Sequence, residues 1–228
     1  MKFLLILILI ALVYLYLVFG SANAKMVNRA KRGKTPDEKK VVEYFLRQGI
    51  ARKLTGVMSD DDYVKMVENK ANSLGLRQKA VEQTGLDESQ IKEIKPINLV
   101  GYKFKNAWAR NTDTNKNVSS RYEVTWIFFS ETQLYMYTYT FDLDQDWHSS
   151  LTEEFFYQDV TSVSSSNTSE TAKFMESGVE REKTVDTTEV HMVVPGDKMT
   201  FAMNGTDLST ANESVQGMKQ MLREKKNA

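Results

Sequence analysis

Four acidic side chains in the middle of the chain have the spacing of a calcium-binding loop. Asp142, Asp144 and Asp146 alternate with other residues, and Glu153 comes eleven positions after Asp142. Oxygen ligands at loop positions 1, 3, 5 and 12 suit a hard cation such as Ca²⁺. However, Trp147 occupies the sixth position, where glycine normally permits the sharp turn. We therefore predict no metal site and interpret this stretch as an acidic hairpin loop, with these four carboxylates as the candidate ligands if a metal were bound.

The sequence shows no recognisable arrangement for catalysis. His148 and His191 are the two histidines, cysteine is absent, and neither histidine has neighbours typical of a nucleophile or a three-ligand metal site. His191 alternates with Val190 and Met192 in a predicted strand, so we expect it to face solvent. Neither a glycine-rich phosphate loop nor a nucleophile elbow occurs. The sequence therefore predicts no catalytic residue, no cofactor and no enzymatic activity.

Two aromatic runs form the most strand-like part of the chain. They are Arg121–Phe129 (RYEVTWIFF) and Gln133–Phe141 (QLYMYTYTF), and the three residues between them fit a hairpin turn. One face of the first run carries Tyr122, Val124, Trp126 and Phe128, and one face of the second carries Tyr135, Tyr137, Tyr139 and Phe141. Such rings could stack on bases, but residues 97–228 carry 13 Lys and Arg against 19 Asp and Glu. We therefore predict core packing and no nucleic acid partner.

Five further strands bring the predicted total to seven. They are Ile97–Phe104, Glu153–Gln158, Val160–Ser166, Thr184–Val194 and Lys198–Met203. Three polar stretches are expected to be loops, Lys105–Ser120, Asp142–Thr152 and a mobile Asn167–Arg181. A helix from about Asn212 to Lys226 has Val215, Met218 and Leu222 on one face. We expect this helix to cover the open end of an antiparallel sheet.

Residues 36–95 have the pattern of several small amphipathic helices. Thr35 precedes Pro36 and two acids, which is typical of a helix start, and Ser59 precedes three aspartates in the same way. Gly75 and Gly85 interrupt or close later helices. Residues 87–90 form a further capping box, and Pro96 ends the helix that it begins. We expect these helices to pack on each other and on the sheet.

The first residues form an apolar segment followed by basic residues. Phe3–Phe19 is an unbroken apolar run long enough for a thin bilayer. Five basic residues follow, namely Lys25, Arg29, Lys31, Arg32 and Lys34, against Lys2 on the other side. This asymmetry predicts a retained single-pass anchor whose C-terminal side is cytoplasmic. Ala22-Asn23-Ala24 also fits a cleavage site, so a cleaved signal peptide and a secreted protein remain the alternative.

The order of these elements resembles the bacterial pleckstrin-homology-like fold. The residues that carry the resemblance are GYKF, EVTWIFF, QLYMYTYTF, EEFFYQDVTSV, EVHMVV, KMTFAM and SVQGMKQMLREKK. Most of residues 59–226 also resembles an uncharacterised family of bacterial membrane-anchored proteins, through DDDYVKMVENKANSLGLRQKAVEQTGLDESQIKEIKPINLVGY and YEVTWIFFSETQLYMYTYTF. The resemblance implies an α+β chain with a seven-stranded, helix-capped antiparallel sheet. We expect an anchor at 1–24, a basic linker at 25–35, a helical segment at 36–96 and the β domain at 97–228.

The resemblance also implies a place for lipid contacts. In lipid-binding pleckstrin-homology domains, the loop after the first strand contacts head groups. The basic residues around that loop here are Lys103, Lys105, Arg110, Lys116 and Arg121. Asp113 lies among them, and residues 97–228 carry a net charge of −6, so charge favours a solvated loop.

These observations predict a membrane-anchored, non-enzymatic interaction domain that binds a protein or peptide at the inner face of the membrane. The acidic charge of residues 97–228 favours a basic or apolar partner. The alternatives are phospholipid head-group binding through the Lys105–Arg121 loop and, from another class, an enzyme.

Overall fold

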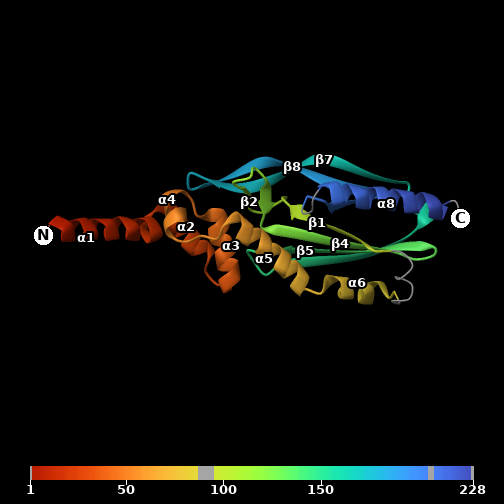
Figure 1. Ribbon diagram of the computed structural model, residues 1–228, viewed down its shortest axis with the longest axis horizontal. Coiled ribbons are helices and arrows are strands. Elements are labelled where there is room, and N and C mark those ends of the chain that lie inside the picture. The colour runs from red at the N-terminus through yellow and green to blue at the C-terminus, as the bar shows by residue number, and fades with distance from the viewer. Residues whose placement is uncertain (1, 87–94, 205–207, 227–228) are drawn as a thin grey trace.

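The computed structural model describes residues 2–86, 95–204 and 208–226. An apolar helix projects from one end along the longest axis, and the other elements pack together behind it (Figure 1). The helices are α1 (Lys2–Leu15), the π-helix η1 (Tyr16–Gly20), α2 (Ala22–Ala30), α3 (Pro36–Leu46), α4 (Gly49–Leu54), α5 (Asp60–Ser73), α6 (Leu76–Thr84), the 3₁₀-helix η2 (Tyr157–Asp159) and α8 (Leu208–Lys226). The strands are β1 (Ile97–Lys103), β2 (Ala109–Asn111), β3 (Asn117–Ser119), β4 (Arg121–Phe129), β5 (Gln133–Asp142), β6 (His148–Phe156), β7 (Ser162–Glu176), β8 (Val179–Val194) and β9 (Asp197–Ala202).

The chain is therefore α+β, but the predicted single sheet of seven strands is wrong. Nine strands form three antiparallel sheets in the described part of the chain. The first has the order β1-β4-β5-β6, the second is the β2-β3 pair, and the third has the order β7-β8-β9. The two extra strands arise because the stretch expected as a loop after β1 folds back on itself as the β2-β3 hairpin.

The β4-β5 hairpin and the alternation of its aromatic side chains are confirmed. The register places Tyr122 opposite Phe141 and Trp126 opposite Tyr137, so the aromatic residues of both strands share one face. The expected loop at 142–152 shrinks to the residues between β5 and β6, because β6 already begins at His148.

The largest correction concerns the segment expected to be polar and mobile. Asn167–Arg181 lies inside a long hairpin in which β7 and β8 pair from Ser162–Val193 to Glu176–Val179. A turn at Ser177 and Gly178 joins the strands, and both residues adopt positive φ. The segment is polar because much of β7 is exposed on at least one face, so its composition hides its pairing with β8.

The residues predicted to begin and end the helices are found at helix ends in the structure. Thr35 forms a complete capping box with Glu38, and the Ser59 side chain accepts a hydrogen bond from the Asp62 amide. Gly75 and Gly85 adopt the left-handed conformation at the two ends of α6, where a side chain would be strained. The helix expected at 87–95 lies outside the described residues, apart from its last position.

Two hydrophobic cores hold the layers together. The four-stranded sheet lies between a helical layer of α3, α5 and α6 and a second layer of α8 and the three-stranded sheet (Figure 1). The first core joins the aromatic face of β4 and β5 to these helices, and includes Val27, Tyr44, Tyr63, Phe128 and Met175. The second core joins the opposite face to β8, β9 and α8, and contains Ile127, Phe129, Val190 and Met192. Val215, Met218 and Leu222 of α8 are buried in it, as predicted.

The N-terminal region departs from the prediction at its linker. The segment Lys2–Gly20 is a single helix. It is long enough and apolar enough to cross a membrane, and almost none of it is buried against the protein. The basic stretch after it is largely helical, because α2 buries Ala24 and places Val27 in the first core. The expected linker is therefore partly a structural element of the folded domain.

Candidate functional site

The four acidic candidates for a metal site do not converge. The Arg121 guanidinium binds both carboxylate oxygens of Asp142, with Nε to Oδ1 at 2.6 Å and Nη2 to Oδ2 at 3.0 Å. Asp144 is buried, whereas Asp146 is exposed. Glu153 pairs with Met136, six positions before Asp142 along β5, which corresponds to about 20 Å. No cluster of three metal-ligating side chains occurs among the described residues.

Asp144 has a raised pKa because of its burial and its neighbouring charge. Its pKa is raised by burial and by the neighbouring Asp142 carboxylate, although a hydrogen bond from Ser120 opposes the shift. The Lys34 ammonium donates to the backbone oxygen of Asp144 at 2.6 Å. The acidic turn is therefore tied to the rest of the domain by the basic residues Lys34 and Arg121.

Three of the five candidate lipid-binding bases are engaged inside the protein. The Lys103 ammonium lies 3.0 Å from Glu189 and 3.4 Å from Glu170. The side chain of Arg121 binds Asp142, as described above. The Arg110 guanidinium pairs with Asp60 at 3.5 Å and stacks over the ring of Tyr44.

The other two bases are solvent-exposed. Lys105 follows β1, and Lys116 lies in the turn between β2 and β3. The loop of Lys105 to Arg121 thus presents a smaller basic surface than its sequence suggests.

His191 is buried, so the expectation that it faces solvent is wrong. It is 6% exposed, and its Nε2 lies 2.6 Å from the Ser166 hydroxyl. Its Nδ1 lies 3.1 Å from the Thr200 hydroxyl, where a catalytic triad would place a carboxylate. Burial and the nearby Lys198 lower the pKa of His191, although Glu189 opposes this. The chain of hydroxyl and imidazole groups joins β7, β8 and β9.

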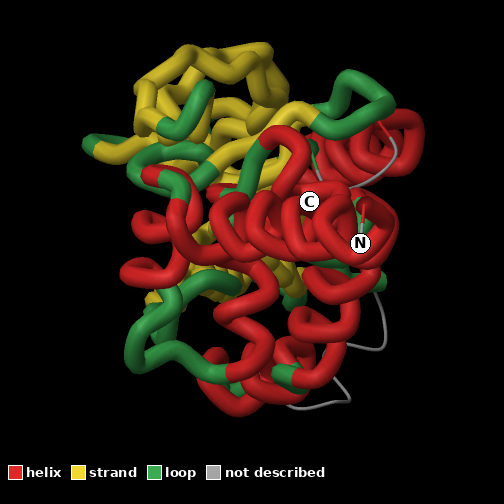
Figure 2. Tube along the Cα trace, turned by 90° about the vertical axis from the view of Figure 1, so that its left-hand side faces the viewer, coloured by secondary structure: helices red, strands yellow, loops and turns green. Residues whose placement is uncertain are grey.

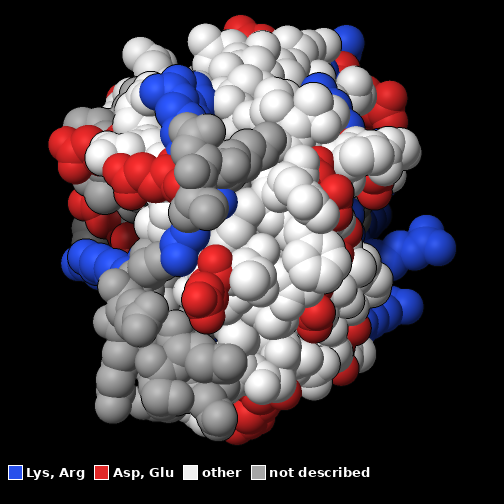
Figure 3. Space-filling model, turned by 90° about the vertical axis from the view of Figure 1, so that its right-hand side faces the viewer, with Lys and Arg blue, Asp and Glu red and all other residues white. Residues whose placement is uncertain are grey.

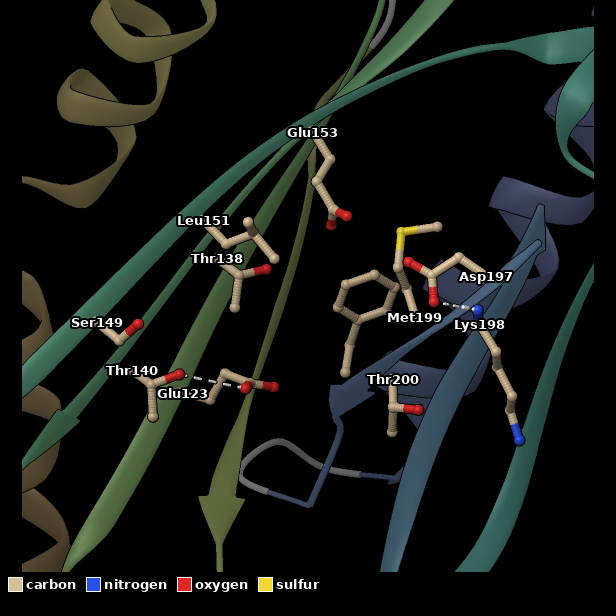
Figure 4. A pocket seen from close by; sticks show the side chains of 11 residues that line it. Glu123, Thr138, Thr140, Ser149, Leu151, Glu153, Asp197, Lys198, Met199 and Thr200 are labelled. Carbon is tan, nitrogen blue, oxygen red and sulfur yellow. Dashed lines mark hydrogen bonds between the residues drawn. The ribbon is translucent and has the colours of Figure 1, made fainter. Parts of the chain in front are cut away.

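The structure reveals a groove that sequence reasoning missed. It lies between the two larger sheets and encloses about 330 Å³. One wall comes from β4, β5 and β6, and the other comes from β9 (Figure 4). Its lining residues are Glu123, Thr138, Thr140, Ser149, Leu151, Glu153, Asp197, Lys198, Met199, Thr200 and Phe201. The β6 and β9 strands are each at the edge of their sheet, so both walls end in a strand with one unpaired side.

The inner end of the groove is a buried acid. Glu123 is 7% exposed, and its carboxylate accepts hydrogen bonds from the Ala202 amide at 2.8 Å and from the Thr140 hydroxyl at 3.3 Å. Burial raises the pKa of Glu123, although the nearby Lys103 opposes the shift. Glu123 therefore fastens β4 to β9 at the point where the two sheets meet.

The outer part of the groove brings two further acids together. Glu153 of β6 points across the gap toward β9 (Figure 4). Burial and the Asp197 carboxylate raise the pKa of Glu153. The Lys198 side chain lines the same groove but points away from Glu153 (Figure 4). The mouth of the groove thus favours a positive charge.

A second, wider hollow of about 700 Å³ lies beside α4. Arg52 and Arg110 line it and stack over the Tyr44 ring, at 5.1 and 5.2 Å from its centroid. Asp60 pairs with both guanidinium groups and accepts a hydrogen bond from the Tyr44 hydroxyl at 2.7 Å. The bases of this hollow are therefore balanced by an internal carboxylate.

The end of the molecule opposite α1 is mostly uncharged. Acidic and basic side chains are scattered over it (Figure 3). No protein-family model, no curated protein and no solved structure matches this chain.

A local sequence signal for part of the groove was present. Glu123 lies on the strand face opposite Tyr122 and Val124, next to Thr125. The face of this strand that carries Glu123 also carries apolar residues, so it is expected to be buried. A single acid on a buried face indicates a carboxylate with a specific partner. Nothing local indicates β9 as the other wall, because Ala202 is 79 residues from Glu123.

Proposed function

We propose that this chain is a single-pass, membrane-anchored binding module without enzymatic activity. Its ligand is an extended, basic segment of a partner protein, held in the groove between β6 and β9. The observation that carries the proposal is the groove itself, a hollow of about 330 Å³ between two edge strands with Glu153 and Asp197 at its mouth.

The edges supply backbone partners. β6 pairs with β5 alone and β9 with β8 alone in the described part of the chain, so each has unpaired amide and carbonyl groups along its other side. An added peptide strand forms main-chain hydrogen bonds with such an edge, and its alternate side chains enter the adjoining pocket. β6 has nine residues, which is long enough to pair with a complete strand.

The lining supplies selectivity. Mutual repulsion of Glu153 and Asp197 is relieved when a Lys or Arg side chain of the partner lies between them, because each carboxylate then gains an opposite charge. Leu151 is 54% exposed and faces the same groove, near Met199 and Phe201. The favoured segment therefore alternates a basic side chain with an apolar one.

We further propose that the groove lies on the cytoplasmic side of the membrane. The support is the apolar Lys2–Gly20 helix followed by five basic residues. The first turns of α2 also support a retained anchor. Asn23 donates to the Leu46 carbonyl at 2.8 Å and accepts from the Gln48 amide at 3.2 Å, so cleavage after Ala24 would remove contacts that end α3.

The pleckstrin-homology-like relationship of residues 97–228 is also part of this proposal. Its support is the terminal α8, which packs Val215, Met218 and Leu222 against the second core. The three sheets depart from a single seven-stranded sheet. Lys103, Arg110 and Arg121 are paired with carboxylates inside the protein, so we place the ligand in the groove rather than at the Lys105–Arg121 loop.

The test uses full-length protein in lipid nanodiscs and an immobilised library of random ten-residue peptides. We expect enrichment of peptides that contain Lys or Arg beside an aliphatic or aromatic residue. Glu153→Gln combined with Asp197→Asn should weaken binding of the enriched peptides. Glu154→Gln is the matched control, because Glu154 is exposed and adjacent in β6 but alternates to the other face. Peptides that bind the double variant as well as the native protein, or no enrichment at all, would exclude the groove as the binding site.

A further inference from the structure

The short helix α4 exposes apolar side chains at the end of the domain nearest α1. Ile50 is 66% exposed and Leu54 is 49% exposed. They are four positions apart and therefore lie on the same side of the helix. Outside α1 and η1, the described residues include six exposed large hydrophobic side chains, Ile50, Leu54, Trp147, Leu151, Phe156 and Val179. Two of these six belong to one helix of six residues.

The position of α4 along the apolar helix fixes its depth. The Lys2–Gly20 segment has 19 residues and spans about 28 Å, close to the roughly 30 Å of a bilayer core. When this segment spans the bilayer, Tyr16–Gly20 must lie at the membrane boundary. α4 contacts this same segment η1, so α4 lies at the level of the boundary as well.

The turn of the β7-β8 hairpin lies close to the same membrane boundary as α4. Its turn residue Gly178 donates from its amide to the Gln48 side chain at 3.1 Å, and a Cβ added at Gly178 would lie 3.8 Å from the Cβ of Asn23. Asn23 is three residues past Gly20, so it lies within about 11 Å of the end of the apolar segment. Val179, which follows the turn, is 56% exposed. Figure 1 shows both α4 and this end of the hairpin beside the base of α1.

The charges at this end are suited to a lipid surface. Lys25, Arg29 and Lys53 are exposed there. The two acids nearest the hairpin turn are paired with bases of the same hairpin, Glu176 with Lys183 and Glu180 with Lys173 at 3.4 Å. Viewed along α1, helices lie beside and below the N-terminal end, and strands lie at the upper left (Figure 2).

We infer that Ile50, Leu54 and Val179 form a second membrane contact, which inserts at the interface while Lys25, Arg29 and Lys53 meet lipid phosphates. This inference rests on the proposed anchoring by α1. Apolar side chains with basic neighbours are the composition of interfacial membrane contacts. The tether keeps this surface at high local concentration beside the bilayer, so a weak contact is sufficient. The contact holds the domain at a fixed tilt and rotation on the membrane.

The absence of cysteine gives a direct test, because single labels can be introduced at will. Ile50→Cys and Leu54→Cys are labelled with the environment-sensitive fluorophore NBD in the full chain. The proteins are reconstituted into vesicles of phosphatidylcholine and phosphatidylglycerol, with and without doxyl-labelled lipid. Leu9→Cys reports on the membrane helix, and Phe156→Cys is a matched exposed apolar position beside the far β4-β5 turn.

We expect blue-shifted emission and quenching by doxyl lipid at positions 9, 50 and 54, and neither effect at position 156. Lys53→Glu should reduce the quenching at position 50 in vesicles that contain phosphatidylglycerol. Quenching at position 9 with positions 50 and 54 behaving like position 156 would overturn the second contact and leave the anchor intact. Failure of quenching at position 9 itself would overturn the anchor and the contact together. Circular dichroism of each variant establishes that the fold is preserved.

Discussion

The Lys103 ammonium of β1 binds the Glu189 carboxylate of β8 at 3.0 Å, across the space between the two larger sheets. Glu170 of β7 lies 3.4 Å from the same ammonium and also accepts the Phe104 and Lys105 amides. Glu123 contributes a third nearby carboxylate. One lysine therefore connects four strands at a largely buried point.

Replacement of Lys103 should destabilise the fold strongly. Lys103→Met leaves Glu170 and Glu189 without their cation, and breaking a buried ion pair in this way costs about 3–5 kcal/mol. Chemical denaturation of the full chain in detergent measures the free energy of unfolding. Lys105→Met is the control, because Lys105 is exposed, and its effect should stay within about 0.5 kcal/mol. Equal stability of the two variants would show that the cluster does not join the sheets.

Glu123→Gln should stabilise the protein at neutral pH. Burial raises the pKa of Glu123 in the folded state, so folding favours its protonated form. The stabilising free energy from protonated Glu123 is therefore complete below the unfolded pKa and is lost as the pH rises through the folded pKa. Gln at this position cannot ionise, so the advantage of Glu123→Gln should be largest at neutral pH, shrink as the pH falls toward the unfolded pKa of about 4, and be absent below it. Melting curves of both proteins across this range test the sign, and a native protein that is more stable at neutral pH would contradict it.

Loss of an apolar contact on α8 should unfold more than the helix. Leu222 is 6% exposed in the core that also contains Val190 and Met192. Leu222→Asp buries an unpaired charge and should destabilise by about 3 kcal/mol or more. Lys225→Glu, in the last turn, should cost less than about 1 kcal/mol. A melting curve unchanged by Leu222→Asp would mean that α8 is not docked.

Two glycines should respond to alanine in opposite directions. A Cβ at Gly101 would lie 2.9 Å from the Asn204 backbone nitrogen and 2.9 Å from the Ala202 side chain. Gly101→Ala must therefore push β1 away from β9, at a cost of about 1–3 kcal/mol. Gly217 is exposed within α8 and has no neighbour within 4 Å of its Cβ position among the described residues, so Gly217→Ala should stabilise by about 0.5–1 kcal/mol. Denaturation midpoints of the two variants give the comparison.

The mature protein should retain its first residues. Ala24 is 1% exposed inside α2, and Asn23 forms two hydrogen bonds at the end of α3. N-terminal sequencing and intact mass of protein isolated from membranes should therefore show a start upstream of Lys25. A start at Lys25 would replace the anchor with a signal peptide and place the domain outside the cell.

Local chemistry predicts much of this fold because caps and alternation act over a few residues. Thr35, Ser59, Gly75 and Gly85 mark helix ends wherever the chain goes, and the rings of β4 and β5 need one buried face. The part of the β7-β8 hairpin at Asn167–Arg181 is expected to be a loop because Ser and Thr suit both loops and exposed strands. Its pairing is visible only once both strands are placed.

The candidate site residues lie apart or are paired internally for a related reason. The spacing of Asp142 and Glu153 suits a loop, but the β5-β6 register extends the residues between them along a strand. The bases Lys103, Arg110 and Arg121 have partners that are 86, 50 and 21 residues away. Counting charges along a sequence treats such residues as free, whereas the fold uses them internally.

The hydrogen bonds of Gln48 impose an order on the biosynthesis of this protein. Gln48 binds the Met175 carbonyl and the Gly178 amide, which are 127 and 130 residues further along the chain. Ribosomes deliver about 5–20 residues per second, so α1 emerges many seconds before those partners exist. During that interval the apolar faces of α2 and α3 remain uncovered. The hairpin that covers them is among the last parts to be synthesised, which makes the nascent chain, rather than the finished domain, the form most in need of a chaperone.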